Sequence, residues 1–359
     1  MNRLYVFGEV VLLKMNPINA GVGPLLEQVF APFVEAGYLR ICYGGAEVGA
    51  YLVEHAGIEA VHITGSVRTH DAIVFGPGAE GAERKRRHTP RLHKPISSEL
   101  GGICPVIILP GTWSKADIAY QAEQVATMRL LNNGYTCVAA QVLITSRSWP
   151  QRAEFMDALR AIFRRVAPRA DYYPGGDRRL QAVLEQHPAA ERFTHDPLRT
   201  IIGDVDPCNH DEISFREEFF APILAETALA GDDAASYLRN AVQFCNERLV
   251  GTLGATLLGH PTTMRALGPA VEAAVDALHY GVIGVNEWHG AAFSLAQAPW
   301  GGYPGASIYD VQSGVGVVHN SLFFDRPEKT VIRGSFYAFP RGVLHGDFAL
   351  FPRQPWLIA

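Results

Sequence analysis

Short apolar strands alternate with amphipathic helices through most of the chain, and this alternation constrains the fold more than any other feature. In the first part of the sequence, strand-like runs at 8–14, 39–43 and 59–63 are separated by helical patterns at 24–37 and 46–56. Tight alternation of this kind is typical of βαβ units, whose strands lie parallel in one sheet. The sequence therefore predicts an α/β fold.

Residues with strong positional preferences mark the ends of several expected helices. Pro24 suits the start of the helix at 24–37 and Gly37 suits its end, while Pro32 predicts a kink inside it. Farther along, Ser114 with Asp117 has the spacing of a capping box, in which each side chain bonds the other residue's backbone N–H. A helix is therefore expected to begin just after Ser114.

The strand and helix pattern is interrupted and then resumes. The basic, proline-containing stretch at 81–95 is expected to be an exposed loop. Strands follow at 105–110 and 138–145, with a helix near 149–166. The region 170–215 is rich in proline, aspartate and histidine and is weakly patterned, so it is expected to be irregular.

The composition narrows the class of protein. A length of 359 residues suggests two domains, and a net charge of -5 provides no global basic field for nucleic acid. No stretch approaches the roughly 18 apolar residues of a membrane span. The 5 cysteines are scattered without a CxxC pair, which indicates reduced thiols. We therefore expect a soluble cytoplasmic protein that binds neither nucleic acid nor membrane.

Two common kinds of catalytic site find no support in the motifs. The 13 histidines form no HExxH motif and no clustered Cys/His spacing, so no metal site is expected. A GxSxG motif is also missing, which argues against a serine hydrolase. The glycine-rich run GGAEVG (44–49) follows a strand but is not GxGxxG, so by itself it is weak evidence for dinucleotide binding.

Three short stretches each contain candidate functional residues, and together they are stronger evidence for a catalytic site than any one of them alone. In ITGS (63–66), Gly65 allows close backbone approach and Ser66 can cap a helix whose N-terminus favours phosphate. Glu99 in SSELGG is a candidate general base. Cys137 in GYTC is a candidate nucleophile, although a lone cysteine is more often a small apolar core residue.

These stretches belong to a longer ordered series. The later members are EEFFAP (217–222), GVIGVN (281–286), WGG (300–302) and SGVG (313–316). In this order and spacing the chain resembles the aldehyde dehydrogenase superfamily, from about Gly8 to about Lys329. The resemblance implies an incomplete Rossmann-type nucleotide-binding domain at 1–101, an α/β catalytic domain at 102–312, and a segment at 313–359 that returns to the first domain and forms an oligomer interface.

The resemblance also implies roles for individual residues. Cys137 matches the nucleophile that attacks an aldehyde, and Glu99 matches the base that activates water to hydrolyse the resulting thioester. The expected ligands of an NAD or NADP cofactor are Lys14, Gly65, Ser66, Glu218 and Phe220. The expected partners are a small-molecule aldehyde and further copies of the chain in a dimer or tetramer.

Some departures from the family pattern leave alternatives open. The family's opening strands and its oxyanion asparagine precede the strand of Lys14, and this sequence starts after them, as in a truncated, divergent member. The chain is therefore alternatively a catalytically silent or partner-dependent homologue that acts as a binding or assembly subunit. Pro17 replaces a frequent glutamate, which leaves NAD and NADP equally open. A third hypothesis is that the acyl group of the thioester passes to coenzyme A instead of water. The presence of Glu99 argues against this, because transfer to coenzyme A needs no base for hydrolysis.

Overall fold

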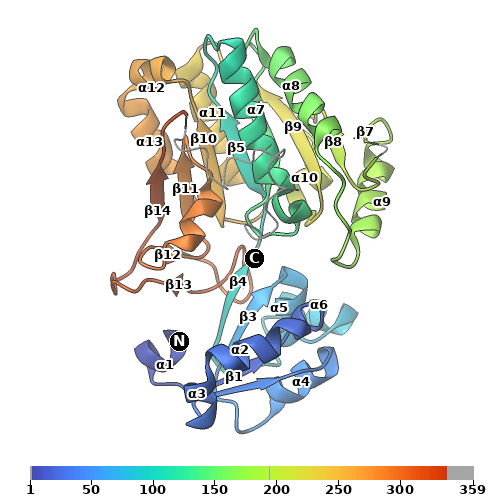
Figure 1. Ribbon diagram of the computed structural model, residues 1–359, viewed down its shortest axis with the longest axis vertical. Helices are drawn as coiled ribbons and strands as arrows, with labels where there is room; N and C mark the ends of the chain where they lie inside the picture. The colour runs from blue at the N-terminus through green and yellow to red at the C-terminus, as the bar shows by residue number, and fades with distance from the viewer. Residues whose placement is uncertain (1, 194, 338–359) are drawn as a thin grey trace. The chain divides into compact units, whose positions relative to one another are not determined.

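The computed structural model describes residues 2–193 and 195–337. It divides the chain into two compact units, Met1–Ser98 and Glu99–Ala359 (Figure 1). The boundary lies close to residue 101, where the sequence suggested that the first domain ends. Both units combine helices with strands, which confirms the predicted α/β fold class.

The first unit contains short elements close to their predicted positions. They are α1 (Asn2–Phe7), β1 (Val11–Lys14), the 3-10 helix η1 (Pro17–Val22), α2 (Gly23–Val29), α3 (Ala31–Glu35), β2 (Leu39–Cys42), α4 (Ala46–Glu54), β3 (Val61–Gly65), α5 (Val67–Val74), α6 (Gly78–Arg86) and β4 (Ile96–Leu100), the last of which runs into the second unit. Strands β1 and β2 pair in parallel, with Val11 opposite Leu39. Strand β3 pairs with β4 instead, so the strands form two separate pairs rather than one sheet.

The predicted kink in the helix at 24–37 is confirmed. Helix α2 ends at Val29 and α3 begins at Ala31, and Phe30 between them leaves helical geometry at φ -103° and ψ 22°. Pro32 has no N–H to donate to a carbonyl one turn earlier, and its ring crowds that turn. The sequence therefore divides this helix in two.

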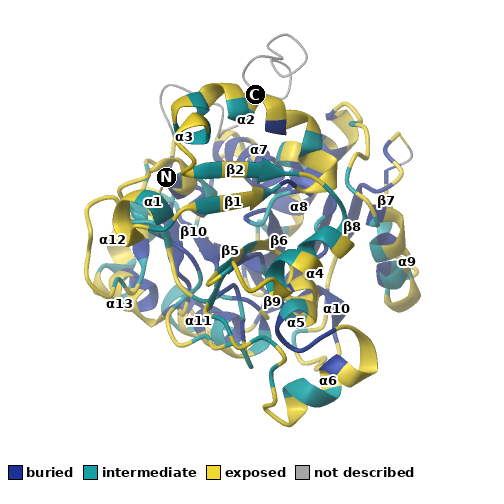
Figure 2. Cartoon of the chain, turned by 90° about the horizontal axis from the view of Figure 1, so that it is seen from below, coloured by how far each residue is buried: buried dark blue, intermediate teal, exposed yellow. Residues whose placement is uncertain are grey.

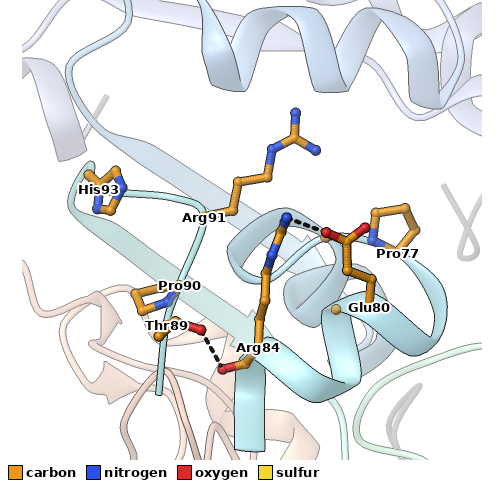
Figure 3. A pocket seen from close by; sticks show the side chains of 9 residues that line it. Pro77, Glu80, Arg84, Thr89, Pro90, Arg91 and His93 are labelled. Atoms are coloured by element: carbon orange, nitrogen blue, oxygen red, sulfur yellow. Dashed lines mark hydrogen bonds and ion pairs between the residues drawn. The ribbon is translucent and has the colours of Figure 1, made fainter. Parts of the chain in front are cut away.

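The expectation of a loop at 81–95 is wrong for its first part, because α6 extends to Arg86. Glutamate and arginine one turn apart support this helix through the pairs Glu80–Arg84 and Glu83–Arg87. A hollow of about 650 Å³ lies beside α6 and is lined by Arg84, Thr89 and other residues of this stretch. Figure 3 shows Arg84 turned toward Glu80 there.

The second unit is built on an eight-stranded sheet in the order β14-β11-β10-β5-β6-β9-β8-β7. Its neighbouring strands are parallel except for the antiparallel pair β7 and β8. The strands are β5 (Cys104–Ile108), β6 (Ala140–Ser146), β7 (Glu191–Arg192), β8 (Thr200–Ile202), β9 (Ile223–Leu229), β10 (Gly254–Leu258), β11 (Val282–Val285) and β14 (Thr330–Arg333), with β12 (Pro299–Trp300) and β13 (Val318–His319) as a separate pair.

Helices cover both faces of this sheet. They are α7 (Lys115–Leu130), α8 (Arg152–Arg165), α9 (Gly176–Gln186), α10 (Ile213–Arg216), α11 (Ala234–Arg248), α12 (Pro261–Leu267) and α13 (Pro269–Ala277), with 3-10 helices η2 (Leu131–Gly134) and η3 (His289–Ser294). The predicted capping box of Ser114 and Asp117 starts α7. Figure 1 shows α7 and α8 in front of the sheet.

Successive side chains of the central strands enter two different cores, because strand side chains alternate between faces. Val106 and Ile108 pack with residues of α7 and α8. Ile107 between them packs in the other core, with residues of α11 and α13. A strand covered on both faces reads as a continuous apolar run, which explains why the sequence at 105–110 shows no polar alternation.

One expectation for the second unit needs correction. The region 170–215 is not irregular throughout, because α9, β7, β8 and α10 lie in it. In the described part of the segment 313–359, β14 pairs with β11 in the second unit's sheet. Thr330, which is buried, and the β-branched residues Val331 and Ile332 suit such an added edge strand. The return of this segment to the first domain stays a prediction. The remainder of that segment, 338–359, lies outside the described residues, as does the interface expected there.

Candidate active site

Cys137 follows a turn with an unusual backbone. Asn132, Asn133 and Gly134 all have left-handed φ angles, of 51°, 53° and 76°. Asparagine tolerates this region better than most residues, and the side chain of Asn132 donates to the Tyr135 carbonyl at 2.9 Å. A Cβ on Gly134 would lie 2.7 Å from the carbonyl carbon of Ala221. The turn before the cysteine therefore requires glycine at this position.

The buried guanidinium of Arg129 holds this turn in place. Arg129 is 1% exposed and donates to the carbonyl of Ala140 at 3.0 Å and to that of Gly134 at 3.4 Å. It also donates to the carbonyl of Ala221. These bonds join the end of α7, the start of β6 and the segment before β9, so the approach to Cys137 is fixed from several sides.

Glu99 lies at the end of β4 and is 8% exposed. The indole Nε1–H of Trp300 donates to its Oε1 at 2.8 Å. The SGVG stretch secures the adjoining backbone, because Ser313 accepts from the N–H of Leu100 through its carbonyl at 3.0 Å and donates its hydroxyl to the Gly101 carbonyl at 2.9 Å. Three of the stretches singled out in the sequence thus meet at this carboxylate.

Glu218 lies against the two glycines that follow Glu99. A Cβ on Gly101 would overlap the Glu218 carboxylate, and the N–H of Gly102 donates to that carboxylate. Withdrawal from water raises the pKa of Glu218 to about 7, against the opposing charges of Arg129 and Arg179. The carboxylate therefore titrates near neutral pH.

Cys137 is partly buried, and the charges of both acids act on its thiol. Burial is the first cause that raises the pKa of its thiol, to about 12, and the charges of Glu99 and then Glu218 add to it. The Thr136 side chain and the cysteine's own N–H act in the opposite direction. The structure therefore brings Cys137, Glu99 and Glu218 together, with the thiol protonated at neutral pH.

Phe220 belongs to an aromatic cluster that includes Tyr135, which lies between the turn at 132–134 and Cys137. Its ring centre lies 4.8 Å from that of Tyr173 and 5.8 Å from that of Tyr135. Tyr135 also stacks on Tyr173 at 5.7 Å. Sequence reasoning missed Tyr173 because it lies in the region expected to be irregular.

The other expected cofactor ligands lie in the first unit. Ser66 caps α5 as expected, and its Oγ accepts from the N–H of Thr69 at 3.2 Å. The first turn of α5 has no acidic residue and contains Arg68, so its donors suit an anionic phosphate. Gly65 ends β3 just before this cap. Lys14 ends β1, and its Nζ donates to the Met15 carbonyl at 3.2 Å.

Known proteins resemble this chain in sequence. The sequence model of the aldehyde dehydrogenase family matches residues 4–171. Coniferyl aldehyde dehydrogenase from a Pseudomonas species is 25% identical over 256 residues, which cover 66% of this chain and 50% of that protein. Succinate-semialdehyde dehydrogenase [NADP(+)] from Deinococcus radiodurans is 27% identical over 264 residues, with the same coverage of 66% and 50%.

Solved structures share the fold. Aldehyde dehydrogenase C from Pseudomonas syringae, a mutant solved with NAD+ and octanal, superposes with a TM-score of 0.60 at 21% identity and covers 87% of this chain and 60% of that one. In sequence and in fold, the chain is similar to the aldehyde dehydrogenase superfamily. It spans about half the length of the curated superfamily relatives described above.

The similarity to this superfamily accounts for the order of the motifs but not for every residue at the site. Trp300 and Arg129 were not predicted as site residues, although Trp300 donates a hydrogen bond to Glu99 and the charge of Arg129 acts on Glu218. The sequence did contain a pattern that pointed to Trp300, namely a large side chain followed by two glycines. Arg129 had none, since a basic residue late in a helix reads as exposed. Among residues 2–193 and 195–337, no three His, Cys, Asp or Glu side chains are grouped to hold a metal ion. Over the same residues, no helix is long and apolar enough to cross a membrane.

Proposed function

We propose that the protein is an NAD(P)-dependent oxidoreductase that converts an aldehyde to a carboxylic acid. One observation carries this proposal: a partly buried thiol, that of Cys137, is acted on by the charges of two carboxylates, Glu99 and Glu218, within a superfamily fold. A thiol suits this chemistry because sulfur is both a strong nucleophile and a workable leaving group.

In the first step the sulfur of Cys137 bonds to the aldehyde carbon. Because its high pKa keeps the thiol protonated, the proton must pass to a nearby group as the bond forms. Glu99 and Glu218 are the carboxylates whose charges reach the sulfur. The aldehyde oxygen gains negative charge on the tetrahedral carbon, where the backbone N–H of Cys137 is one nearby donor.

The nicotinamide cofactor, when bound, supplies the acceptor for the hydride that this carbon loses, which leaves a thioester on Cys137. The donor set of the first unit fits a dinucleotide phosphate at Gly65 and Ser66, with Lys14 as a further cation. In the second unit, the half-buried carboxylate of Glu218 suits ribose hydroxyls and the ring of Phe220 suits a flat heterocycle. NAD and NADP both remain within this proposal.

Hydrolysis then releases the acid. Glu99 accepts a proton from water while the water oxygen bonds to the thioester carbon, and the carbon–sulfur bond breaks. The products are the carboxylic acid and the restored Cys137 thiol. A base within reach of the thioester is what separates hydrolysis from transfer to another thiol such as coenzyme A.

The Cys137→Ser variant tests the proposal, with Cys208→Ser as the matched control because Cys208 is exposed and outside the site. With propanal or benzaldehyde as probe and NAD+ or NADP+, we expect Cys137→Ser to lose at least about 1,000-fold in reduced-cofactor formation. Unchanged turnover in Cys137→Ser would refute the mechanism. A wild-type chain that binds cofactor and never turns over would favour the silent, partner-dependent homologue instead.

We propose further that the protein works in the cytoplasm as a homo-oligomer. All 5 cysteines are free thiols, which suits a reducing compartment. The edge strand β14, with Val331 exposed, offers a place for further pairing. Light scattering of the purified protein measures the oligomer directly, and a monomer at micromolar concentration would contradict this part.

A further inference from the structure

The indole of Trp300 makes a directional contact with Glu99. Its Nε1–H donates to Oε1 at 2.8 Å, and Trp300 is 1% and Glu99 8% exposed. An indole nitrogen can only donate, and an ionised carboxylate can only accept. The bond therefore restrains the rotation of the carboxylate, with Oε1 on the indole.

Trp300 is held by contacts that do not involve Glu99. It lies in β12, opposite Val318 of β13, and the ring of Phe293 packs edge-on at 5.1 Å. The carbonyl of the preceding Pro299 accepts from the Thr330 hydroxyl at 2.7 Å. The indole is thus anchored by contacts independent of Glu99 and can act as a fixed support for that carboxylate.

We propose that Trp300 is a positioning residue that holds the Glu99 carboxylate ready to take the proton from the water that hydrolyses the Cys137 thioester. The inference rests on the proposed function and specifies a residue for its second half-reaction. The chemical balance is unchanged: water adds its oxygen to the thioester carbon and its proton to Glu99, and the sulfur leaves. Trp300 itself neither gains nor loses a proton.

Other titratable groups face the same carboxylate. His319 of β13 is one, because burial lowers its pKa and the charge of Glu99 raises it in return. The Cys137 thiol on the catalytic turn is the second, and Glu218 acts on that same thiol. A pH profile of hydrolysis therefore reports this group of residues, and the effect of Trp300 is the difference between two variants measured identically.

The Trp300→Phe variant removes the N–H and keeps an aromatic ring, and Trp149→Phe is its matched control. Trp149 is also buried and donates its indole N–H at 2.8 Å, but to the Gly111 carbonyl. The probe is p-nitrophenyl acetate, which acetylates a nucleophilic thiol and releases p-nitrophenolate without aldehyde or cofactor. The rapid first release reports acetylation of Cys137, and the slow phase reports hydrolysis of the thioester.

For Trp300→Phe we expect an unchanged rapid phase, a slow phase reduced about tenfold, and acetylated protein that accumulates in intact mass spectra. Trp149→Phe should match wild type in both phases, and Glu99→Gln should nearly abolish the slow phase.

Different failures have different meanings. A slow phase in Trp300→Phe as fast as in wild type would overturn the role of Trp300 alone. Equal loss of both phases in Trp300→Phe would also overturn it, because the tryptophan would then support the site as a whole. No acetyl adduct on Cys137 in the wild-type protein would overturn the proposed function together with this inference.

Discussion

The strands of the two units differ in how completely they are covered. Every residue of β5 and β6 in the second unit is buried, whereas no residue of β1 or β2 in the first unit is. Figure 2 displays this contrast in its burial colours. Buried apolar surface contributes roughly 25 cal/mol per Å², so side chains in the second unit are held by far more packing energy.

This difference matches the demands of the proposed chemistry. The nucleophile and base need fixed geometry, and they are attached to the covered sheet and its loops. Lys14 and Ser66, the expected cofactor contacts, extend from half-exposed strands and bond mainly to local backbone. The three predictions below test how much buried contacts contribute to the stability of each unit.

The largest effect is expected from a buried ion pair. Arg199 and Asp196 in the second unit are only 1% and 2% exposed. Arg199 also donates to the carbonyl of Phe163 in α8 and to that of Val166 just after this helix. Arg199→Met leaves a buried aspartate without its partner and should lower the free energy of unfolding by about 3–5 kcal/mol. Urea denaturation followed by circular dichroism measures this.

The matched change in the first unit is Arg91→Met. Arg91 pairs with Glu54, but the two side chains are 52% and 58% exposed. Solvent screening limits such a pair to less than about 1 kcal/mol. Similar losses in both variants would remove the contrast between the units.

A smaller effect is expected from two glycines with left-handed backbones. Gly134 has φ 76° and no space for a Cβ, whereas Gly78 has φ 69° and nothing within 4 Å of one. Gly134→Ala combines backbone strain with a clash and should cost about 3 kcal/mol and most catalytic turnover. Gly78→Ala carries the strain alone, about 1 kcal/mol. Thermal unfolding of both variants separates these contributions, and equal costs would show that the Ala221 contact is unimportant.

The smallest effect depends on pH. The pKa of Glu218 is raised from 4.5 to about 7, so between these values the folded protein holds a proton that the unfolded chain releases. The free energy of unfolding contributed by this group therefore falls as pH rises from about 5 to 8. Glu218→Gln removes the titration and should be more stable than wild type at pH 8 by about 1–2 kcal/mol, with the gain lost near pH 5. The adjacent, exposed Glu217→Gln is the control, and a pH-independent difference would contradict the prediction.

Local signals in the sequence predicted much of the fold. The capping box at Ser114, the cap at Ser66 and the break near Pro32 depend on residues within one helical turn of each other. Helix α9 was missed because prolines and glycines around it obscure the spacing of its buried residues Leu180 and Val183. The motif order also predicted that Cys137 and Glu99 come together.

What the sequence did not predict depends on distant contacts. Trp300 lies 201 residues from Glu99, and no local pattern shows that an indole N–H meets that carboxylate. The high pKa of the Cys137 thiol also depends on residues distant in the sequence, since it arises from burial and from acids on separate segments. A motif identifies which residues take part, but the protonation of each depends on the packed environment.

The buried guanidinium of Arg129 also sets an order of events during folding. Its bond to Ala140 spans 11 residues, but its bond to Ala221 spans 92. Closing the longer loop costs more chain entropy and belongs to a later stage. We therefore expect the turn before Cys137 to be completed only when β9 joins the sheet. Until then we expect Cys137 to react as an ordinary exposed thiol, so the rate at which a refolding chain loses its reactivity to an alkylating reagent would report when this turn is assembled.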